Sequence, residues 1–338
     1  MRICVSRAKK LHFTLLQPDF VRAETLLTVE AFPSSKGLPV SKKKIFAALA
    51  ALPLIATLAA CSSTGAEASA EKGTADNPVK IGVVGASDPY WETYTQAAAD
   101  EGITVEIVDF GEYTQPNPAL SEGDIDINQF QHVIYLAQYN EASGDDLTPI
   151  GATAIYPLGL YSTQYDSVED IPDGAEVAVP NDESNQARGL LVLQSAGLIE
   201  LKGGGSVFST VADVDESASR VKVTALEASL TPTSLPDVAA AIINNDFIED
   251  SGLKASDAIA QDDPADPNAV PYINIFVTKA EDADNEVYNK LVEIYHNSQD
   301  VLDGVQKTAG GTAQFVDTSA KDLQASLDEV VADIKDQG

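Results

Sequence analysis

The sequence has little cysteine, histidine and tryptophan, and this scarcity excludes several kinds of site. Its 338 residues include two cysteines, three histidines and one tryptophan. A small secreted domain held by disulfides needs several cysteines, and a zinc or manganese site needs clustered histidines, cysteines or carboxylates. The histidines after Cys61, which are His132 and His296, lie far apart in the sequence. The composition therefore provides neither a disulfide framework nor a recognisable metal-binding motif.

Positive charge is also scarce. The chain has 21 lysines and arginines against 52 aspartates and glutamates, a formal net charge of −31 at pH 7. Such a surface repels phosphate backbones and anionic lipids, so nucleic acid is excluded as a partner. After Cys61, arginine occurs only as Arg188 and Arg220. An isolated arginine in so acidic a chain is a candidate for binding an anion.

The N-terminal part contains a bacterial lipoprotein signal. Residues 41–60 begin with Ser41-Lys42-Lys43-Lys44, continue as an apolar run over 45–57 and end in small residues directly before Cys61. The run is shorter than a membrane-spanning helix, and this combination is typical of a cleaved signal peptide. We expect Cys61 to carry lipid that anchors the protein to the outer face of the cell membrane. Residues 61–78 are expected to form a flexible tether, rich in Ser, Gly, Ala and Glu.

The first forty residues differ from the rest of the chain. They contain scattered basic residues and show no clear periodicity or targeting pattern. We interpret residues 1–40 as a leader that is not translated, with the true start near Leu38 or Val40.

The remaining chain alternates between strand and helix patterns, which predicts an α/β fold. Strands are expected over 79–85, 103–110, 125–128, 147–161, 176–179 and 272–278, and helices over 90–101, 118–122, 129–140, 184–196, 234–243, 282–296 and 321–334. By this pattern the chain leaves one α/β unit near residues 156–161, forms a second unit and returns to the first near residue 272. We therefore predict two lobes, residues 79–158 plus 273–338 and residues 159–272, joined by a hinge.

One strand–turn–helix stretch suits an anion. The strand at 176–179 ends in Pro180-Asn181-Asp182, Ser184 is the expected helix cap, and Gly197 ends the helix. A helix start after a strand directs free backbone N–H groups at a ligand. Arg188 lies about one turn into this helix, and its planar guanidinium matches a carboxylate. Without the rest of the sequence, it could equally be an ordinary surface arginine.

Three groups of residues carry a resemblance to a known family. They are Gly123-Asp124-Ile125-Asp126-Ile127-Asn128-Gln129-Phe130-Gln131-His132, then Pro180-Asn181-Asp182 through Ala187-Arg188, and Pro271-Tyr272-Ile273-Asn274. In order and spacing they resemble the NlpA/MetQ family of methionine-binding lipoproteins from bacterial ABC importers, and the similarity extends from Lys80 to the C-terminus. It implies a type II periplasmic-binding-protein fold with an interlobe ligand cleft. It also implies methionine as the ligand, and an ABC transporter permease and ATPase as partners of a monomeric protein.

The resemblance implies a set of ligand-binding residues. Arg188 corresponds to the arginine on the ligand carboxylate; Tyr113, Phe130, His132 and Tyr135 correspond to the aromatic wall; Asn185, Asn244 and Asn274 correspond to polar groups at the amino-acid end. These types suit methionine, which has two opposite charges and a polarizable thioether tail. Some alternatives stay open. Phe130 and Tyr135 are also typical of a lobe core, His132 of a structural histidine, Trp91 of either core or pocket rim, and Asn245 could replace Asn244.

Two other classes of function compete with transport. A metal-binding lipoprotein of an importer would need clustered ligands, which the sequence does not show. An enzyme on the same fold would need a nucleophile elbow, a phosphate loop or a catalytic triad in a recognisable context, and none is found. We therefore expect a binding protein that is not an enzyme and that uses no cofactor.

Overall fold

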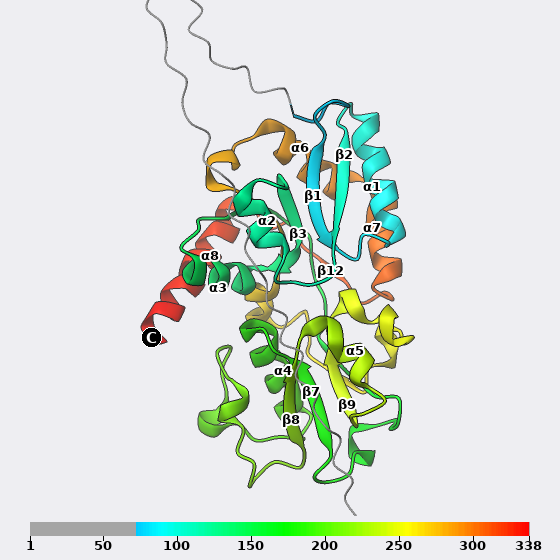
Figure 1. The fold of residues 1–338 in the computed structure, drawn as a ribbon, viewed down its shortest axis with the longest axis vertical. Helices are drawn as coiled ribbons and strands as arrows, with labels where there is room; N and C mark the ends of the chain where they lie inside the picture. Colours follow the sequence, from blue (N-terminus) through cyan, green and yellow to red (C-terminus); the bar gives the residue numbers. More distant parts are fainter. Residues whose placement is uncertain (1–71, 338) are drawn as a thin grey trace, which may run out of the picture. The chain divides into compact units, whose positions relative to one another are not determined.

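Two mixed five-stranded sheets form the framework of the protein, one in each lobe (Figure 1). The structure is a computed structural model that describes residues 72–337, all within one compact unit. In the first sheet the strand order is β2-β1-β3-β11-β4. Its strands are β1 (Val79–Val84), β2 (Val105–Phe110), β3 (Ile127–His132), β4 (Thr148–Ala152) and β11 (Asn274–Thr278). Strand β11 runs antiparallel to both of its neighbours, whereas β1, β2 and β3 are parallel.

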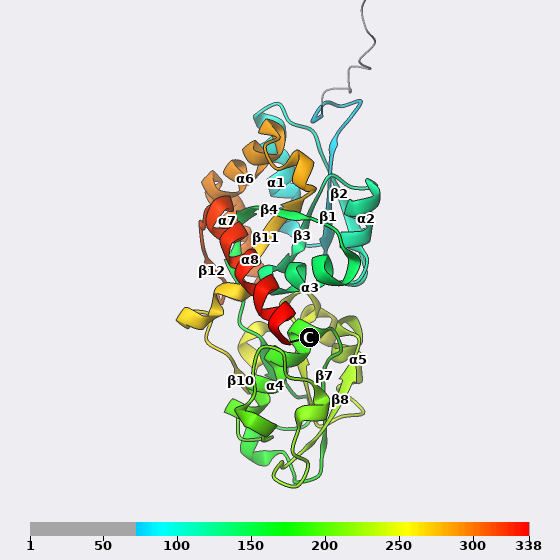
Figure 2. The same ribbon diagram turned by 90° about the vertical axis from the view of Figure 1, so that its left-hand side faces the viewer.

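Helices cover both faces of the first sheet (Figure 2). They are α1 (Pro89–Asp100), α6 (Glu286–Asn297) and α7 (Gln299–Thr308) on one face, and α2 (Pro116–Glu122), α3 (Val133–Ser143) and α8 (Ala320–Gln337) on the other. Successive strand residues point to opposite faces, so in β11 Phe276 packs with α1 and α6, while Ile275 and Val277 pack with α3 and α8. This alternation divides the core of the lobe into two layers. Trp91 lies in one of them and is 2% exposed, which identifies it as a core residue.

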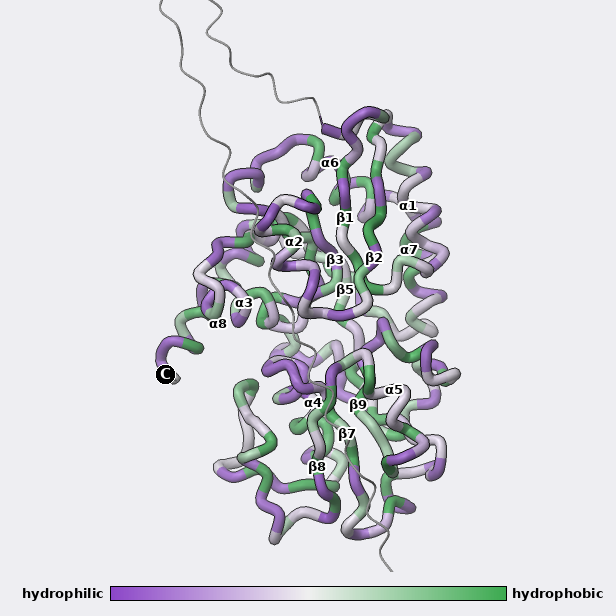
Figure 3. Tube along the Cα trace, viewed as in Figure 1, coloured by the Kyte–Doolittle hydropathy of each residue, from purple (hydrophilic) through white to green (hydrophobic). Residues whose placement is uncertain are grey.

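The second sheet has the order β10-β6-β9-β7-β8. Its strands are β6 (Gly159–Tyr161), β7 (Glu176–Pro180), β8 (Lys222–Leu226), β9 (Ala240–Ile243) and β10 (Ala260–Gln261), with helices α4 (Glu183–Ser195) and α5 (Thr231–Ser234) beside them. Apolar residues of α4 pack on β6, β7 and β9, and hydrophobic colour recurs along the strands in Figure 3. Short 3-10 helices span Val168–Asp170, Lys202–Gly204, Val211–Asp213, Ala228–Leu230, Asn245–Phe247, Glu249–Ser251, Ala255–Asp257, Pro267–Tyr272 and Ala280–Asp282.

Two connectors join the sheets. The first connector, residues 153–158, includes β5 (Ala154–Ile155), which pairs with β12 (Gln314–Phe315). The second connector, residues 262–273, includes the 3-10 helix Pro267–Tyr272. In residues 72–337, no helix is long and apolar enough to cross a membrane.

The start of the described chain is attached to the first lobe. Lys72 Nζ lies 2.7 Å from Asp126 Oδ1, and the Gly73 carbonyl accepts a hydrogen bond of 2.7 Å from the Thr104 N–H. Residues 72–78, the last part of the predicted tether, therefore contact the folded lobe. The rest of that tether, the signal sequence, Cys61 and the leader lie outside the described residues.

Two predicted helices are wrong in part. The helix expected over 234–243 is replaced by α5, which ends at Ser234, and by the strand β9. Every residue of β9 is buried, and a short apolar run that is buried on both faces has no period to distinguish strand from helix. The helix expected over 129–140 begins too early, because Ile127–His132 is strand β3. Helix α7 and strand β8 were not predicted.

Polar residues hide the strand character of β3. Asn128 and Gln131 are fully buried, and both contact Asn117 of α2 through side-chain hydrogen bonds of 2.6–2.9 Å. Buried amides are tolerated when each finds a partner. This partner lies on another element, so the strand itself does not show an apolar pattern.

Candidate functional site

A small pocket between the two lobes is lined by all of the predicted ligand-binding residues. They are Tyr113, Phe130, His132 and Tyr135 from the first lobe, Asn185, Arg188 and Asn244 from the second, and Asn274 at the start of β11. The free space among them is about 20 Å³, enough for about one water molecule. An amino acid can therefore enter only if the surrounding side chains or the lobes move apart.

The first turn of α4 shapes the second-lobe side of the pocket. Asp182 caps this helix and accepts hydrogen bonds of 2.9 Å from both the backbone N–H and the side-chain amide of Asn185. The predicted cap, Ser184, is wrong: it is the second residue of the helix and donates to Asp182 at 3.1 Å. Asp182 has the extended backbone that an N-cap requires. Asp182 thereby fixes Asn185, whose Oδ1 is left to accept hydrogen bonds from groups other than Asp182.

His132 stands opposite Asn185 on the first lobe. It caps α3, and its Nδ1 accepts a hydrogen bond of 3.3 Å from the Tyr135 N–H. Its Nε2 lies 3.3 Å from Asn185 Oδ1, so Nε2 is the protonated nitrogen that donates. Burial is the main cause that lowers the pKa of His132 to about 3, and the nearby positive charge of Arg188 is the second cause. The imidazole is therefore neutral and acts as a polar bridge between the lobes.

Arg188 is held on three sides by the protein. Its Nε donates to Asp262 Oδ2 at 2.6 Å, its Nη2 donates to the Tyr156 carbonyl at 2.8 Å, and its Cζ lies 4.3 Å from the centre of the Tyr272 ring. The side chain is 6% exposed. Arg188 lines the pocket, and these contacts use two of its five guanidinium N–H groups, so the others are candidates for binding an anion.

An aromatic wall closes the opposite side. Phe130 lies with its ring centre 5.9 Å from that of Tyr113 and 5.7 Å from that of Tyr135. The Tyr135 hydroxyl donates to the Tyr113 carbonyl at 3.0 Å, and the Tyr113 hydroxyl donates to Asp246 Oδ2 at 2.7 Å. The hydroxyls are thus engaged at the edges of the wall, which leaves ring surface for an apolar group. Phe130 and Tyr135 serve both as wall and as packing for the lobe.

The structure distinguishes the two neighbouring asparagines. Asn244 is 7% exposed and donates to Asn185 Oδ1 at 2.9 Å, while Asn245 donates to Asp246 at 2.7 Å. The Oδ1 atom of Asn244 is buried and has no hydrogen-bond partner among the described residues. A buried acceptor without a donor is costly, and here it lines the pocket. This unpartnered oxygen makes Asn244 a candidate acceptor for a ligand, and the choice between Asn244 and Asn245 stays a prediction.

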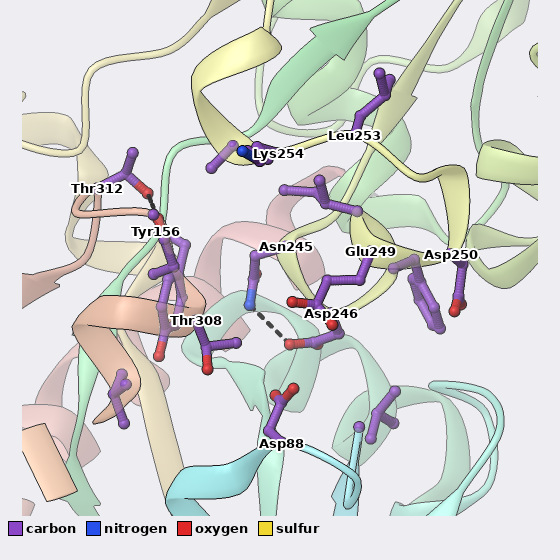
Figure 4. A pocket seen from close by; sticks show the side chains of 18 of the residues that line it. Asp88, Tyr156, Asn245, Asp246, Glu249, Asp250, Leu253, Lys254, Thr308 and Thr312 are labelled. Atoms are coloured by element: carbon purple, nitrogen blue, oxygen red, sulfur yellow. Dashed lines mark hydrogen bonds between the residues drawn. The ribbon is translucent and has the colours of Figure 1, made fainter. Parts of the chain in front are cut away.

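A second and larger cavity adjoins this pocket and shares Asn245, Asp246, Tyr156 and Pro157 with it (Figure 4). Its volume is about 540 Å³. Asp88, before α1, points toward Asp246 from the facing lobe. Burial, with the charge of Glu249 as a second cause, raises the pKa of Asp88 to about 6. Burial is also the main cause that raises the pKa of Asp246 to about 7, and the charge of Asp88 adds to it. In the described range of the chain no group of three or more His, Cys, Asp or Glu residues is placed to hold a metal ion.

Sequence reasoning missed four residues that shape the pocket, namely Tyr156, Asp246, Asp262 and Tyr272. Asp262 and Asp246 lie in acidic loops that look like solvated surface, and the Tyr156 contact is made by a backbone carbonyl. None of these features carries a motif. Only the Pro271-Tyr272 pair, which belongs to the family pattern quoted above, offered a signal.

Comparisons with known proteins identify the family. A model of the NlpA lipoprotein family matches residues 79–316. The D-methionine-binding lipoprotein MetQ of Escherichia coli is 39% identical over 277 residues, which cover 80% of this chain and 97% of that relative. Outer membrane lipoprotein 2 of Mannheimia haemolytica is 34% identical and is covered to 99%.

Solved structures show the same fold. The substrate-binding protein of a methionine transporter from Streptococcus pneumoniae has a TM-score of 0.66 and 35% identity, covering 71% of this chain and 95% of that chain. A nutrient-binding protein from Burkholderia cenocepacia bound to methionine has a TM-score of 0.65 and 37% identity, covering 70% and 99%. The predicted two-lobed type II periplasmic-binding-protein fold is confirmed.

Proposed function

The chain belongs to the NlpA lipoprotein family, and we propose that it captures methionine, or a close derivative, for an ABC importer. The ligand would be bound between the lobes and delivered to the permease and ATPase complex. The observation that carries the proposal is the convergence of the eight residues named above on one pocket, although they come from separate elements of two lobes. The protein would act by binding alone, without catalysis or a cofactor.

Each part of methionine finds a matching group. The carboxylate would bind the free N–H groups of Arg188, because a planar guanidinium can donate two parallel hydrogen bonds to it. The ammonium would donate to the unpartnered Oδ1 of Asn244, with Asn185 and Asn274 beside it. The thioether would lie against Tyr113, Phe130 and Tyr135, since sulfur makes favourable contacts with aromatic rings.

Binding would be coupled to movement of the lobes. We propose that residues 79–158 plus 273–338 form one lobe, that residues 159–272 form the other, and that both connectors act as the hinge. The small free volume of the pocket supports this proposal, because a ligand must enter an opened form and be enclosed afterwards. The His132–Asn185 and Tyr113–Asp246 hydrogen bonds join the lobes in the closed form.

The protein would work at the membrane surface. We propose that Cys61 is lipidated after cleavage of residues 41–60, which holds the protein at the outer face of the cell membrane. This placement fits a monomeric receptor that delivers its ligand to a permease in the same membrane.

Native mass spectrometry followed by calorimetry tests the proposal. We expect methionine, or a derivative of it, to co-purify with the protein. After unfolding and refolding, the ligand-free protein should bind methionine with a stoichiometry of one. Leucine and glycine serve as competitors, and a chelator tests the metal-binding alternative. A melting temperature that falls with chelator and is indifferent to methionine would overturn the proposal, and turnover of the bound ligand would indicate an enzyme.

A further inference from the structure

The guanidinium of Arg188 contacts both connectors between the lobes. Its Nη2 donates to the carbonyl of Tyr156 in the first connector, and its Nε donates to the carboxylate of Asp262 in the second. The ring of Tyr272, also in the second connector, lies against its face. Arg188, which is proposed to bind the ligand carboxylate, is therefore also in contact with both connectors.

Asp262 joins these contacts to one another. One of its oxygens, Oδ2, accepts from Arg188 at 2.6 Å, and the other, Oδ1, accepts from the Leu158 N–H at 2.8 Å. The Asp262 N–H in turn donates to the Leu158 carbonyl at 3.3 Å. Asp262 thus connects α4 to the first connector through its side-chain carboxylate, and its backbone N–H joins the two connectors to each other.

We infer that Asp262 is a positioning residue for carboxylate recognition, a role that rests on the proposed function of Arg188. Asp262 does not line the ligand pocket, whereas Arg188 does. By engaging Nε from behind, Asp262 fixes the plane of the guanidinium and leaves its far edge for the ligand. A planar donor that is held in advance loses less entropy when it binds.

Asp262 also has an effect that would weaken carboxylate binding, and this effect is the smaller one. As an anion it partly neutralises Arg188, which by itself would reduce attraction for a ligand carboxylate. Its side chain is 28% exposed, however, so solvent screens this charge. Orientation of the fork, which depends on the direct hydrogen bond between Asp262 and Arg188, is the larger effect.

Asp262→Asn separates these two effects. Asparagine has nearly the same shape but only one carbonyl oxygen, so it cannot accept from both Arg188 and the Leu158 N–H. Its amide group must face one of these two donors. Either Arg188 loses its acceptor, or the oxygen of the new asparagine keeps Arg188 but its NH2 group faces the Leu158 N–H that held the side chain in place. In both cases the plane of the guanidinium should be less firmly fixed, although the attractive charge of Arg188 is no longer compensated.

The test measures binding of methionine and of methioninamide, in the same enantiomer, to ligand-free refolded protein. Methioninamide has no carboxylate for Arg188 to recognise. Asp262→Asn should weaken methionine binding by about tenfold to a hundredfold, the effect of one hydrogen bond to a charged group, and change methioninamide binding by less than about twofold. Asp262→Glu, which keeps both oxygens, should restore part of the loss.

The matched control is Asp173→Asn. Asp173 pairs with the other arginine, Arg220, at 3.1 Å, and its side chain is 82% exposed. This variant should bind both ligands as the parent does. The inference is overturned if Asp262→Asn binds methionine as tightly as the parent or more tightly, or if it loses both ligands equally, as a merely structural residue would. If Asp262→Asn does not fold, Asp262→Glu decides the matter by the same comparison of the two ligands. A parent that does not bind methionine overturns the proposed function, and the inference with it.

Discussion

The Nε2 atom of His132 lies 3.3 Å from Oδ1 of Asn185, and this hydrogen bond joins the first turns of two helices that belong to different lobes. Asn185 is held in turn by Asp182, and His132 by the Tyr135 N–H. Both helices therefore present their N-terminal ends to the same pocket. His132, the cap of α3, thus contacts Asn185, the residue of α4 that the cap of that helix, Asp182, holds in place.

The neutral state of His132 predicts a pH dependence of stability. Its pKa is lowered to about 3 in the folded protein by burial and by Arg188, compared with about 6.5 when unfolded. Between these two pKa values the unfolded chain binds more protons at His132 than the folded protein does. The contribution of the neutral His132 to folding stability is therefore complete above pH 6.5 and is lost as the pH falls toward 3. His132→Gln should flatten the stability profile over this range in urea unfolding of ligand-free protein. The control, His296→Gln at the end of α6, should keep the slope, and an unchanged slope in His132→Gln would contradict the assignment.

Replacing Arg188 should remove most of the binding free energy for the ligand carboxylate. We expect Arg188→Ala to weaken methionine binding by about 2–5 kcal/mol, the usual cost when one member of a buried charge pair is removed. Lysine should restore only a part, because a point charge on a flexible stem cannot reproduce the bidentate fork. Titration calorimetry on refolded protein measures the difference.

The control for Arg188 is the other arginine in the folded chain. Arg220 pairs with the exposed Asp173 and is itself 36% exposed. Arg220→Ala should change methionine affinity little, since exposed ion pairs contribute about 0–1 kcal/mol. If Arg220→Ala loses methionine binding while Arg188→Ala binds as the parent does, the ligand carboxylate has been assigned to the wrong arginine.

The sequence predicted the fold, and the residues that meet in one pocket, better than it predicted the support around that pocket. The fork of Arg188 stood out because arginine is rare in this chain, and the strand before it has a clear alternating pattern. Asp262 lies 74 positions away in an acidic loop, and only the folded chain brings it to Nε. Likewise β9 is a buried apolar run, and β3 carries amides that are satisfied by α2. Long-range partners, rather than local propensity, decide these positions.

Methionine should shift the protein toward the closed form. A ligand changes an equilibrium between two forms only through its different affinity for each. Contacts from both lobes would supply that difference, because the pocket is lined by Phe130 and His132 on one side and by Asn185 and Arg188 on the other. Small-angle scattering of refolded, ligand-free protein should show a smaller radius of gyration when methionine is added. Arg188→Ala should not respond at the same concentration, and an unchanged radius in the parent would argue against closure.

Lipid attachment predicts where a variant protein is found. Cys61→Ser removes the thiol that would carry the lipid, and no helix of residues 72–337 could replace it as a membrane span. The variant should therefore be released from the membrane while its methionine affinity is unchanged. Fractionation followed by a salt wash tests this expectation. If the serine variant stays with the membrane after the wash, the anchor lies elsewhere.

Asp246 should make the protein less stable as the pH rises. Burial, the main cause, together with the charge of Asp88, raises its pKa to about 7, above the value of about 4 in an unfolded chain. The folded protein therefore holds the extra proton between these values, and stability falls as the pH increases through this range. Asp246→Asn keeps an acceptor for the Tyr113 hydroxyl and should gain about 1–3 kcal/mol at pH 8 but little at pH 4. Urea unfolding at both values measures this difference. Asp250→Asn, an exposed residue of the same cavity, is the control, and a gain of equal size at both pH values would show that packing, not charge, limits stability at Asp246.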